Sequence, residues 1–233
     1  MNTIITGATS DHLELMKKLL RSVRQFHPTD VELVAWDLGL TAEERTGLIK
    51  EFDGLHVRVF DYSKYPAYYN IKVAAGEYAW KPALIRLTRQ EFGQRTYLWL
   101  DAGDRIQEPL IKLFQFIAAK GFFSNVTHGT VAKWTHPAVF KALDPRFEGY
   151  KGLRMRNGAI IGFNERLGWV RELMDLYAGW ASTKEIIAPE GSSRVNHRQD
   201  QSCLTLLYWD YNRRHAFHTE VPCYSIRIHT KYE

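Results

Sequence analysis

The chain lacks the features that mark secreted and membrane proteins. Its 233 residues include two cysteines, Cys203 and Cys223, too few for a disulfide framework, so we expect a reducing compartment and thiols packed in the interior. No run approaches the roughly 20 apolar residues that a membrane span requires, and residues 1–20 carry four charged side chains, unlike a secretory signal. The sequence therefore predicts a cytoplasmic protein, with contact at a membrane surface left open.

Linkers, internal repeats and low-complexity tracts are also missing. The composition, 45% hydrophobic and 24% charged, is that of an ordinary globular protein, so we expect one domain over residues 1–233. The net charge of +5 fits a phosphorylated ligand, an anionic membrane surface or nucleic acid and does not distinguish them.

Glycine is scarce after the first predicted strand. The opening stretch TIITGATSDHLEL places Thr6-Gly7 at the end of an apolar run, as many nucleotide-binding proteins do. A dinucleotide site needs further glycines about four and six residues after the first, where the backbone approaches the pyrophosphate. Asp11 and Leu13 occupy those positions, and a carboxylate there repels a pyrophosphate. The spacing argues against an NAD-dependent dehydrogenase.

What is present is an alternation of strands and helices. Apolar positions from Leu15 to Phe26 fall on one helical face, and Thr41 with Glu44 forms a capping-box signature. This alternation predicts an α/β fold with a mostly parallel central sheet and helices on both faces. We predict strands at 2–7, 31–36, 55–60, 96–100 and 158–163, and helices at 15–26, after Thr41, and at 81–92, 166–180 and 199–209.

Residues 61–79 interrupt the alternation. They hold five tyrosines and little periodicity, which predicts a long loop at the carboxyl edge of the sheet. Ligands of open α/β sheets bind beyond the carboxyl ends of the strands. The residues that directly follow each strand are therefore the site candidates.

The strongest chemical signal is TYLWLDAGDRI, residues 96–106. An apolar strand runs into Asp101, and Asp104 follows three residues later. Mg²⁺ and Mn²⁺ take such oxygen ligands and leave positions for phosphates and water. The alternative is that Asp101 caps the next turn and Asp104 is solvated.

Two further segments place polar residues beside apolar elements. Asn157-Gly158 precedes a short apolar strand, and Asp200-Gln201 starts an apolar helix. A helix start can aim a side chain at a pocket, although aspartate is also favoured there for capping and for the helix dipole.

Basic residues supply candidate phosphate contacts. Lys81 stands beside Pro82 at a predicted helix start, and His229 and Lys231 follow the last strand-like run. The alternative in each case is a solvated surface side chain.

The order of these motifs, from about residue 3 to 231, resembles nucleotide-sugar-dependent glycosyltransferases of the GT-A fold. The closest patterns are those of the glycogenin and bacterial lipopolysaccharide galactosyltransferase family and of related uncharacterised proteins. The resemblance implies that the opening strand and loop bind the nucleotide through Thr6, Gly7, Ala8, Thr9 and Ser10.

The same resemblance implies the remaining roles. It assigns the binding of Mn²⁺ (or Mg²⁺) and of the diphosphate to the strand end, here Asp101 and Asp104, and a sugar or acceptor contact to Asn157 and Gly158. It assigns catalysis to Asp200 and Gln201. The last motif would supply a metal ligand and a phosphate contact, here His229 and Lys231.

The chain departs from the family pattern twice. Gly103 stands where the second aspartate of Asp-x-Asp is expected, so Asp104 must substitute for it. The family's closing His-x-x-Gly-x-x-Lys is shortened to His229-Thr-Lys231. Both departures bear on the predicted metal.

These observations predict a metal-assisted glycosyltransferase. We expect a UDP- or GDP-sugar donor, a hydroxyl acceptor on a glycan, lipid-linked saccharide or protein, and no nucleic-acid partner. Lys81 is a candidate donor contact and Asp200 the candidate base, with Asp144 and Glu148 as alternatives. Stereochemistry and oligomeric state stay open.

Two rival functions follow from the same residues. Gly103 favours a catalytically inactive protein that binds a glycan or a partner. A nucleotidyltransferase shares the sheet and the cation, but residues 6–12 contain no lysine or arginine for its phosphate loop.

Overall fold

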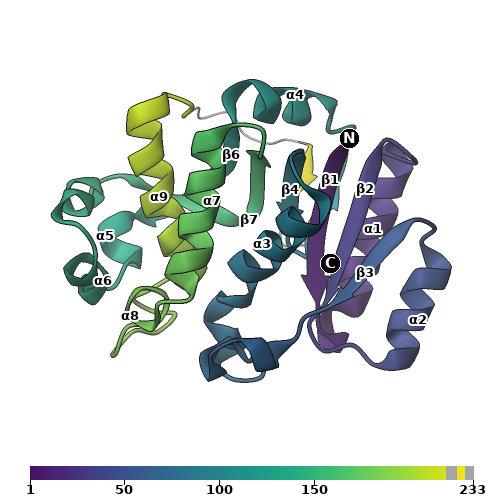
Figure 1. Cartoon of the computed structure of the whole chain (residues 1–233), viewed down its shortest axis with the longest axis horizontal. Helices are drawn as coiled ribbons and strands as arrows, with labels where there is room; N and C mark the ends of the chain where they lie inside the picture. The colour runs from purple at the N-terminus through teal and green to yellow at the C-terminus, as the bar shows by residue number, and fades with distance from the viewer. Residues whose placement is uncertain (219–224, 229–233) are drawn as a thin grey trace.

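A central sheet of six strands organises the computed structural model, which describes residues 1–218 and 225–228. The strand order is β3-β2-β1-β4-β7-β6 (Figure 1). β1 pairs in parallel with β2 and β4, and β2 with β3, whereas β7 runs antiparallel to β4 and β6. The strands are β1 (Asn2–Ala8), β2 (Val31–Asp37), β3 (Leu55–Val59), β4 (Thr96–Leu100), β6 (Phe122–Thr130) and β7 (Arg154–Asn164). The predicted α/β class with a mostly parallel sheet is confirmed.

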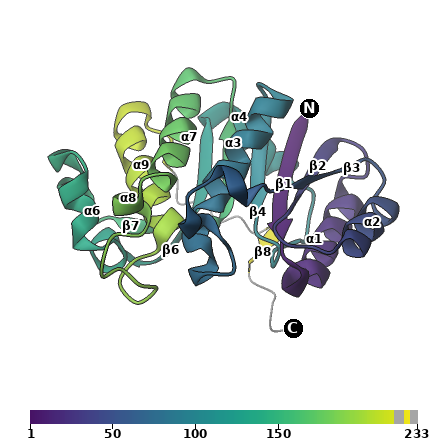
Figure 2. The same cartoon turned by 60° about the horizontal axis from the view of Figure 1, so that its bottom comes forward.

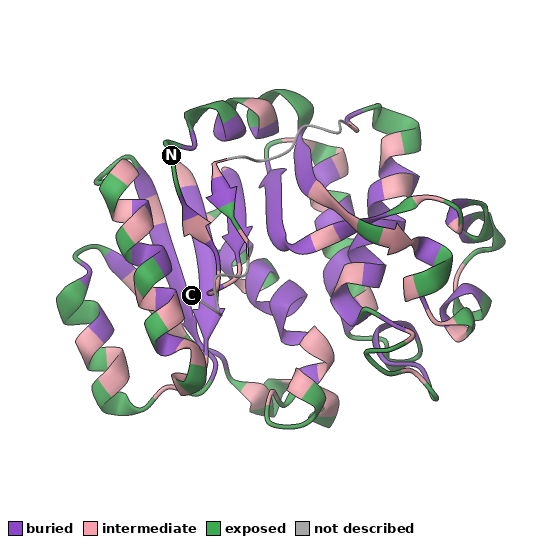
Figure 3. Ribbon diagram, turned by 180° about the vertical axis from the view of Figure 1, so that it is seen from behind, coloured by how far each residue is buried: buried purple, intermediate pink, exposed green. Residues whose placement is uncertain are grey.

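Helices cover both faces of this sheet (Figure 2). Neighbouring residues of β1 point to opposite faces: Ile4 packs with α1, α2 and α4, while Ile5 packs with α3, α7 and α9. The helices of the first face are α1 (Leu13–Phe26), α2 (Ala42–Glu51) and α4 (Ile111–Lys120), and those of the second are α3 (Trp80–Phe92), α7 (Gly168–Ala181) and α9 (Gln199–His215). The sheet is therefore buried on both sides, and Figure 3 shows it largely in the buried colour.

Several local predictions agree with the structure. Thr41 caps α2, and its side chain and that of Glu44 form the reciprocal capping box. The Cys203 thiol is buried in the core between α7 and α9, whereas Cys223 lies outside the described residues. No helix within residues 1–218 and 225–228 is long and apolar enough to cross a membrane.

The segment between β4 and β7 contains elements that the sequence did not predict. They are β5 (Arg105–Ile106), α4, β6, α5 (Val131–Trp134), α6 (Pro137–Ala142) and the 3₁₀ helix η5 (Pro145–Tyr150). β8 (Ile226–Arg227) pairs with β5, and the short helix α8 (Lys184–Ile187) precedes the loop that leads to α9.

The predicted loop at 61–79 contains three 3₁₀ turns, η2 (Tyr62–Lys64), η3 (Ala67–Tyr69) and η4 (Ala74–Tyr78). All five residues of η4 have positive φ between 47° and 62°. Such left-handed backbone is unfavourable for residues other than glycine. At Gly76 glycine is required, because an added Cβ would lie 2.4 Å from the Tyr69 carbonyl oxygen.

Candidate functional site

A cavity of about 660 Å³ opens at the carboxyl ends of β1, β2 and β4. This is the edge at which parallel sheets bind ligands. Residues that follow β1, β2 and β4 line it, together with part of the 61–79 segment and the start of α3. They include Gly7, Ala8, Thr9, Ser10, Asp11, Leu38, Gly39, Lys72, Tyr78, Trp80, Lys81, Trp99, Asp101, Gly103 and Arg194.

Four of the five nucleotide-binding residues predicted at the end of the first strand line the cavity. Gly7 through Ser10 line the cavity, whereas Thr6 is buried within β1. A Cβ on Gly7 would lie 3.2 Å from the Trp36 side chain, so this position has little room for any other residue. The Ser10 hydroxyl donates to the Gly39 carbonyl at 3.0 Å, which joins the loops after β1 and β2.

A buried ion cluster forms the wall of the cavity beneath these loops. The Lys81 ammonium lies 3.0 Å from Asp101 Oδ1 and 3.4 Å from Asp200 Oδ2, and it donates to the Gly158 carbonyl at 3.1 Å. Lys81 is 4% exposed because the first turn of α3 faces the sheet. Pro82 suits this turn, where a backbone N–H has no helical partner. Lys81 thus joins α3 to β4, β7 and α9.

The charges in this cluster shift one another's pKa. Burial alone lowers the pKa of Lys81, but Asp101 and Asp200 outweigh it and raise that pKa, so the ammonium stays charged. Burial raises the pKa of Asp200, and the positive charge of Lys81 opposes this change. The Tyr177 hydroxyl donates to Asp200 Oδ2 at 3.1 Å, and burial raises its pKa well above the ordinary value.

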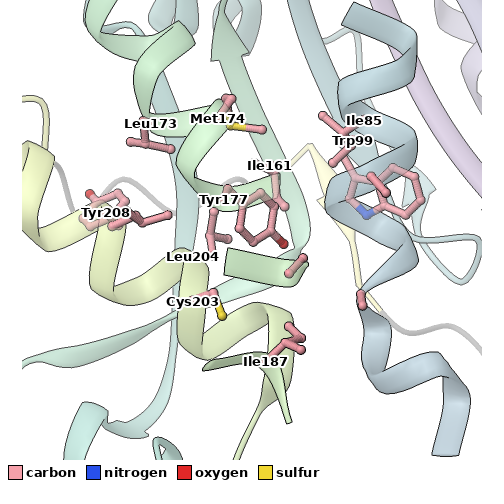
Figure 4. Close-up of a cluster of buried hydrophobic side chains, with 14 of the residues drawn as sticks. Ile85, Trp99, Ile161, Leu173, Met174, Tyr177, Ile187, Cys203, Leu204 and Tyr208 are labelled. Atoms are coloured by element: carbon pink, nitrogen blue, oxygen red, sulfur yellow. The ribbon is translucent and has the colours of Figure 1, made fainter. Parts of the chain in front are cut away.

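Tyr177 reaches Asp200 from the core between α7 and α9. Figure 4 shows its ring among Leu204, Cys203 and Met174, and it is fully buried. Lys81 and Tyr177 both contact Oδ2 of Asp200, which fixes the carboxylate in one orientation. Asp200 is itself 4% exposed and lies behind the residues that line the cavity.

The two predicted metal carboxylates are placed differently. Asp101 lines the cavity with a 30% exposed side chain, and its Oδ1 accepts the Trp99 indole N–H at 2.7 Å. Asp104 is completely buried, and its backbone N–H donates to the Asp101 carbonyl in a tight turn at 2.9 Å. Gly103, which has no side chain to bind a metal, lines the cavity in its place. The predicted solvation of Asp104, offered as an alternative, is wrong.

Metal ligands are few in this arrangement. Among residues 1–218 and 225–228, no group of three or more histidine, cysteine, aspartate or glutamate side chains could hold a metal ion. Asp101 therefore stands alone among the described cavity residues as a predicted metal ligand. His229 and Lys231 lie outside the described residues.

The remaining predicted residues lie around the cluster. Gly158 provides its carbonyl to Lys81, and an added Cβ there would lie 3.3 Å from Asp200 Oδ2. Asn157 uses its side-chain oxygen to accept from the Ala159 N–H at 2.7 Å. Gln201 follows Asp200 on α9, half-buried beside Gly158. None of these three residues lines the cavity.

The alternative bases lie elsewhere. Asp144 caps η5 through the Arg146 N–H, and Glu148 pairs with Lys151 on the exposed side of the same turn. Neither lines the cavity.

Several residues at the site carried no signal in the sequence. Arg194 stacks on the Tyr78 ring, with its guanidinium carbon 5.2 Å from the ring centroid, and also donates to the Tyr78 hydroxyl. Gln199 donates to Glu77 at 3.2 Å. These contacts join η4 to the loop before α9 and to the first residue of α9, which lie more than 110 residues further along the chain.

His197 supports the same loop from inside. Its ring is completely buried, and burial lowers its pKa to about 4. Nδ1 accepts the His136 backbone N–H at 3.3 Å, so the neutral ring carries its proton on Nε2, which lies 3.1 Å from the Ile187 carbonyl oxygen.

One protein family has a model that matches part of the chain. A family described as a protein of unknown function, DUF1647, matches residues 2–86. No curated protein matches the chain.

Solved glycosyltransferase structures match over most of the chain. The galactosyltransferase LgtC in complex with donor and acceptor sugar analogues has a TM-score of 0.58 at 15% identity, over 96% of this chain and 85% of that one. An active-site mutant of LgtC gives 0.59 at 15% identity, over 88% and 70%. Core-mannan synthase A from Aspergillus fumigatus, in its Mn/GDP form, gives 0.61 at 8% identity, over 88% and 68%. The chain therefore has the GT-A fold of these glycosyltransferases.

Proposed function

We propose that this protein transfers a sugar from a nucleoside diphosphate sugar to a hydroxyl acceptor. The observation that carries this proposal is the Lys81–Asp101–Asp200 cluster, which borders a cavity at the ligand-binding edge of a GT-A fold. The cavity, about 660 Å³, falls in the usual range of small-molecule sites, about 300–1,000 Å³. Cleaving the donor develops negative charge on the diphosphate and positive charge on the sugar, and fixed charges that face both favour the reaction.

The proposed roles combine the family resemblance with the positions of the residues around the cavity. Gly7 to Ser10, after β1, would contact the nucleotide, and Asp101 would lie near the diphosphate and donor sugar. Asp200 would take the proton of the acceptor hydroxyl if configuration is inverted, or stabilise the cationic sugar if it is retained. Its raised pKa makes its carboxylate a stronger base than an ordinary aspartate. The resemblance assigns a sugar or acceptor contact to Asn157 and Gly158 and a catalytic role to Gln201, and these residues lie around the cluster but outside the cavity lining.

The divalent cation predicted from the sequence stays a prediction. Core-mannan synthase A was determined in a Mn/GDP form, but the described residues of this chain provide no group of three ligands that includes Asp101. Their chemistry does not fit a complete metal site, so no step of the proposed reaction is assigned to a metal.

Donor turnover tests this proposal. The protein is incubated with UDP- and GDP-sugars, with and without Mn²⁺, and release of nucleoside diphosphate is measured alongside donor binding. We expect the parent protein to bind the donor and to release nucleoside diphosphate. Asp200→Asn should slow that release by about 10²–10⁴ and leave donor binding near that of the parent. Binding without turnover would instead support the inactive glycan-binding function that Gly103 favours, and absence of both would overturn the proposal.

A further inference from the structure

We infer that Lys72 and Arg194 form a cationic site for the diphosphate of the donor and that diphosphate binding there needs no divalent cation. This inference rests on the proposed function and assigns the charge that neutralises the leaving group. It starts from the mismatch between the predicted metal and the side chains that line the cavity.

Lys81 cannot serve as the main phosphate contact. Its ammonium is already shared between Asp101 at 3.0 Å and Asp200 at 3.4 Å. A third anion would have to compete with two carboxylates in a buried position. Asp101 is equally engaged, since its Oδ1 accepts from Lys81 and from the Trp99 indole N–H.

Two other cations line the same cavity with their charges available. Lys72 and Arg194 are both exposed, and neither has a carboxylate within 4.0 Å in the described part of the chain. The acidic residues of the lining are Asp11, after β1, and Asp101. Arginine and lysine can stabilise a departing diphosphate where a metal ion is not held.

Arg194 is held in place before any ligand binds. Its guanidinium stacks on the Tyr78 ring and donates to the Tyr78 hydroxyl. Tyr78 in turn belongs to the left-handed turn η4, which needs glycine at position 76. Gln199 stabilises the same turn by donating a hydrogen bond to Glu77. Lys72 lies six residues before Tyr78 on the same cavity-lining segment. Arg194 is therefore tied to the cavity-lining segment that also carries Lys72, and backbone that is costly to form keeps that segment in shape.

Calorimetric titration with inorganic pyrophosphate, UDP and GDP, in EDTA and then in Mn²⁺, tests the inference. We expect the parent protein to bind all three in EDTA, more weakly as salt is raised. Arg194→Met should weaken binding roughly 10- to 100-fold, the usual effect of losing a hydrogen bond to a charged group, and Lys72→Met should weaken it less because its side chain is flexible. Arg194→Lys keeps the charge but loses the two parallel N–H groups of the guanidinium, so its affinity should lie between those of the parent and Arg194→Met.

Matched controls separate this site from general basicity. Arg198→Met removes an exposed arginine stacked on Trp134, and Lys64→Met removes an exposed lysine paired with Asp61; neither lines the cavity. Both should bind as the parent does, and all variants should keep the parent melting temperature.

The outcomes distinguish this inference from the proposed function. Binding that requires Mn²⁺, is lost with His229→Ala and is unchanged in Arg194→Met would overturn the inference and leave the glycosyltransferase proposal standing. Failure of the parent to bind any nucleotide or nucleotide sugar in either buffer would overturn both.

Discussion

Helix α3 carries two buried cations, Lys81 and Arg89, and their surroundings distinguish a cluster that supports the fold from the cluster that we propose to be functional. Lys81 and Arg89 are eight residues apart, about 12 Å along the helix. Each is less than 10% exposed and each faces two carboxylates. By the sign of the charges and the burial of the central cation alone, the two clusters look alike.

Their geometry is different. Arg89 makes a two-pronged contact with both oxygens of Glu165 at 2.8 Å and a third contact with Asp175 at 2.9 Å, which fixes α3 to the end of β7 and to α7. Lys81 has a single nitrogen at distances of 3.0 to 3.4 Å from its carboxylates, and one of these, Asp101, opens onto the cavity. A guanidinium each of whose nitrogens donates to a carboxylate stabilises the fold. The single ammonium of a lysine, in contrast, leaves some carboxylate oxygens accessible for a ligand.

The sharpest test exchanges one carboxylate in each cluster. Asp200→Asn keeps the shape of the side chain but removes the proposed base, so the rate of sugar transfer should fall by about 10²–10⁴ while donor affinity stays near that of the parent. Glu165→Gln, its counterpart beside Arg89, should leave the rate unchanged and lower the melting temperature. Turnover and thermal unfolding of both variants measure this. A normal rate for Asp200→Asn would mean that Asp200 only supports the helix start.

The second test removes the cations. Arg89→Met leaves Glu165, which is 6% exposed, buried without a partner, and this should cost about 3–5 kcal/mol of unfolding free energy. Nucleotide affinity should not change. Lys81→Met should lose comparable stability. It should also weaken nucleotide binding, because Asp101 loses its positive partner and its carboxylate then faces the cavity unpaired.

Urea unfolding and nucleotide titration of both variants supply the measurements. The double variant Arg89→Met/Glu165→Leu provides the control, since an apolar pair of similar size should recover most of the lost stability. Equal effects of the two single variants on nucleotide binding would contradict the distinction between the clusters.

The sequence predicted the half of the molecule in which contacts are local. The parallel strands from Asn2 to Leu100 and the capping box at Thr41 follow from periodicity and short-range signals, and both agree with the structure. The position of Asp101 at a strand end followed from the same pattern.

The pairing of strands that are distant in the sequence could not be predicted from the pattern of apolar residues. β7 is buried on both faces, so its residues do not reveal that it runs antiparallel to β4. Shifts in register after Ser124 and Val126 break the alternation of β6. The sequence offered Lys81 as a phosphate contact or as a solvated first-turn lysine. Its buried ion pairs were not predicted, because the two carboxylates lie 20 and 119 residues further along the chain.

Arg194 shows the same limit at the site. It stands in the polar stretch GSSRVN, which resembles an ordinary loop. Its partner Tyr78 lies 116 residues earlier, so only the folded chain brings the two together.

The third test uses pH and concerns the start of α9, the helix that carries Asp200. His197 precedes the helix that carries Asp200, and burial lowers its pKa to about 4 from the ordinary 6.5. The unfolded chain therefore binds a proton more readily, and stability should be complete above pH 6.5 and fall as pH drops toward 4, by up to about 3 kcal/mol. Protonation would also place an N–H of Nδ1 against the His136 N–H.

Unfolding free energies at pH 7 and pH 5 check this expectation. His197→Gln should flatten the dependence on pH, while His128→Gln, at an exposed position on β6, should leave it as in the parent. An unchanged slope for His197→Gln would show that His197 is not the titrating group.

The smallest expected effect lies at the solvent side of the Arg89 cluster. Asp175 contacts Arg89 at 2.9 Å, but its side chain is 63% exposed, against 7% for Glu165. Water screens such a pair, so Asp175→Asn should cost no more than about 1 kcal/mol, far less than Glu165→Gln at the buried end of the same guanidinium. The two substitutions make the same chemical change on one arginine, so the difference in their urea midpoints measures the combined effect of burial and of the second hydrogen bond that Glu165 accepts. Raising the salt concentration should remove what remains of the Asp175 contribution and leave that of Glu165 largely intact. If the two variants lost equal stability, the Arg89 cluster would be held by net charge rather than by its buried fork, and it could no longer serve as the structural counterpart of the Lys81 cluster.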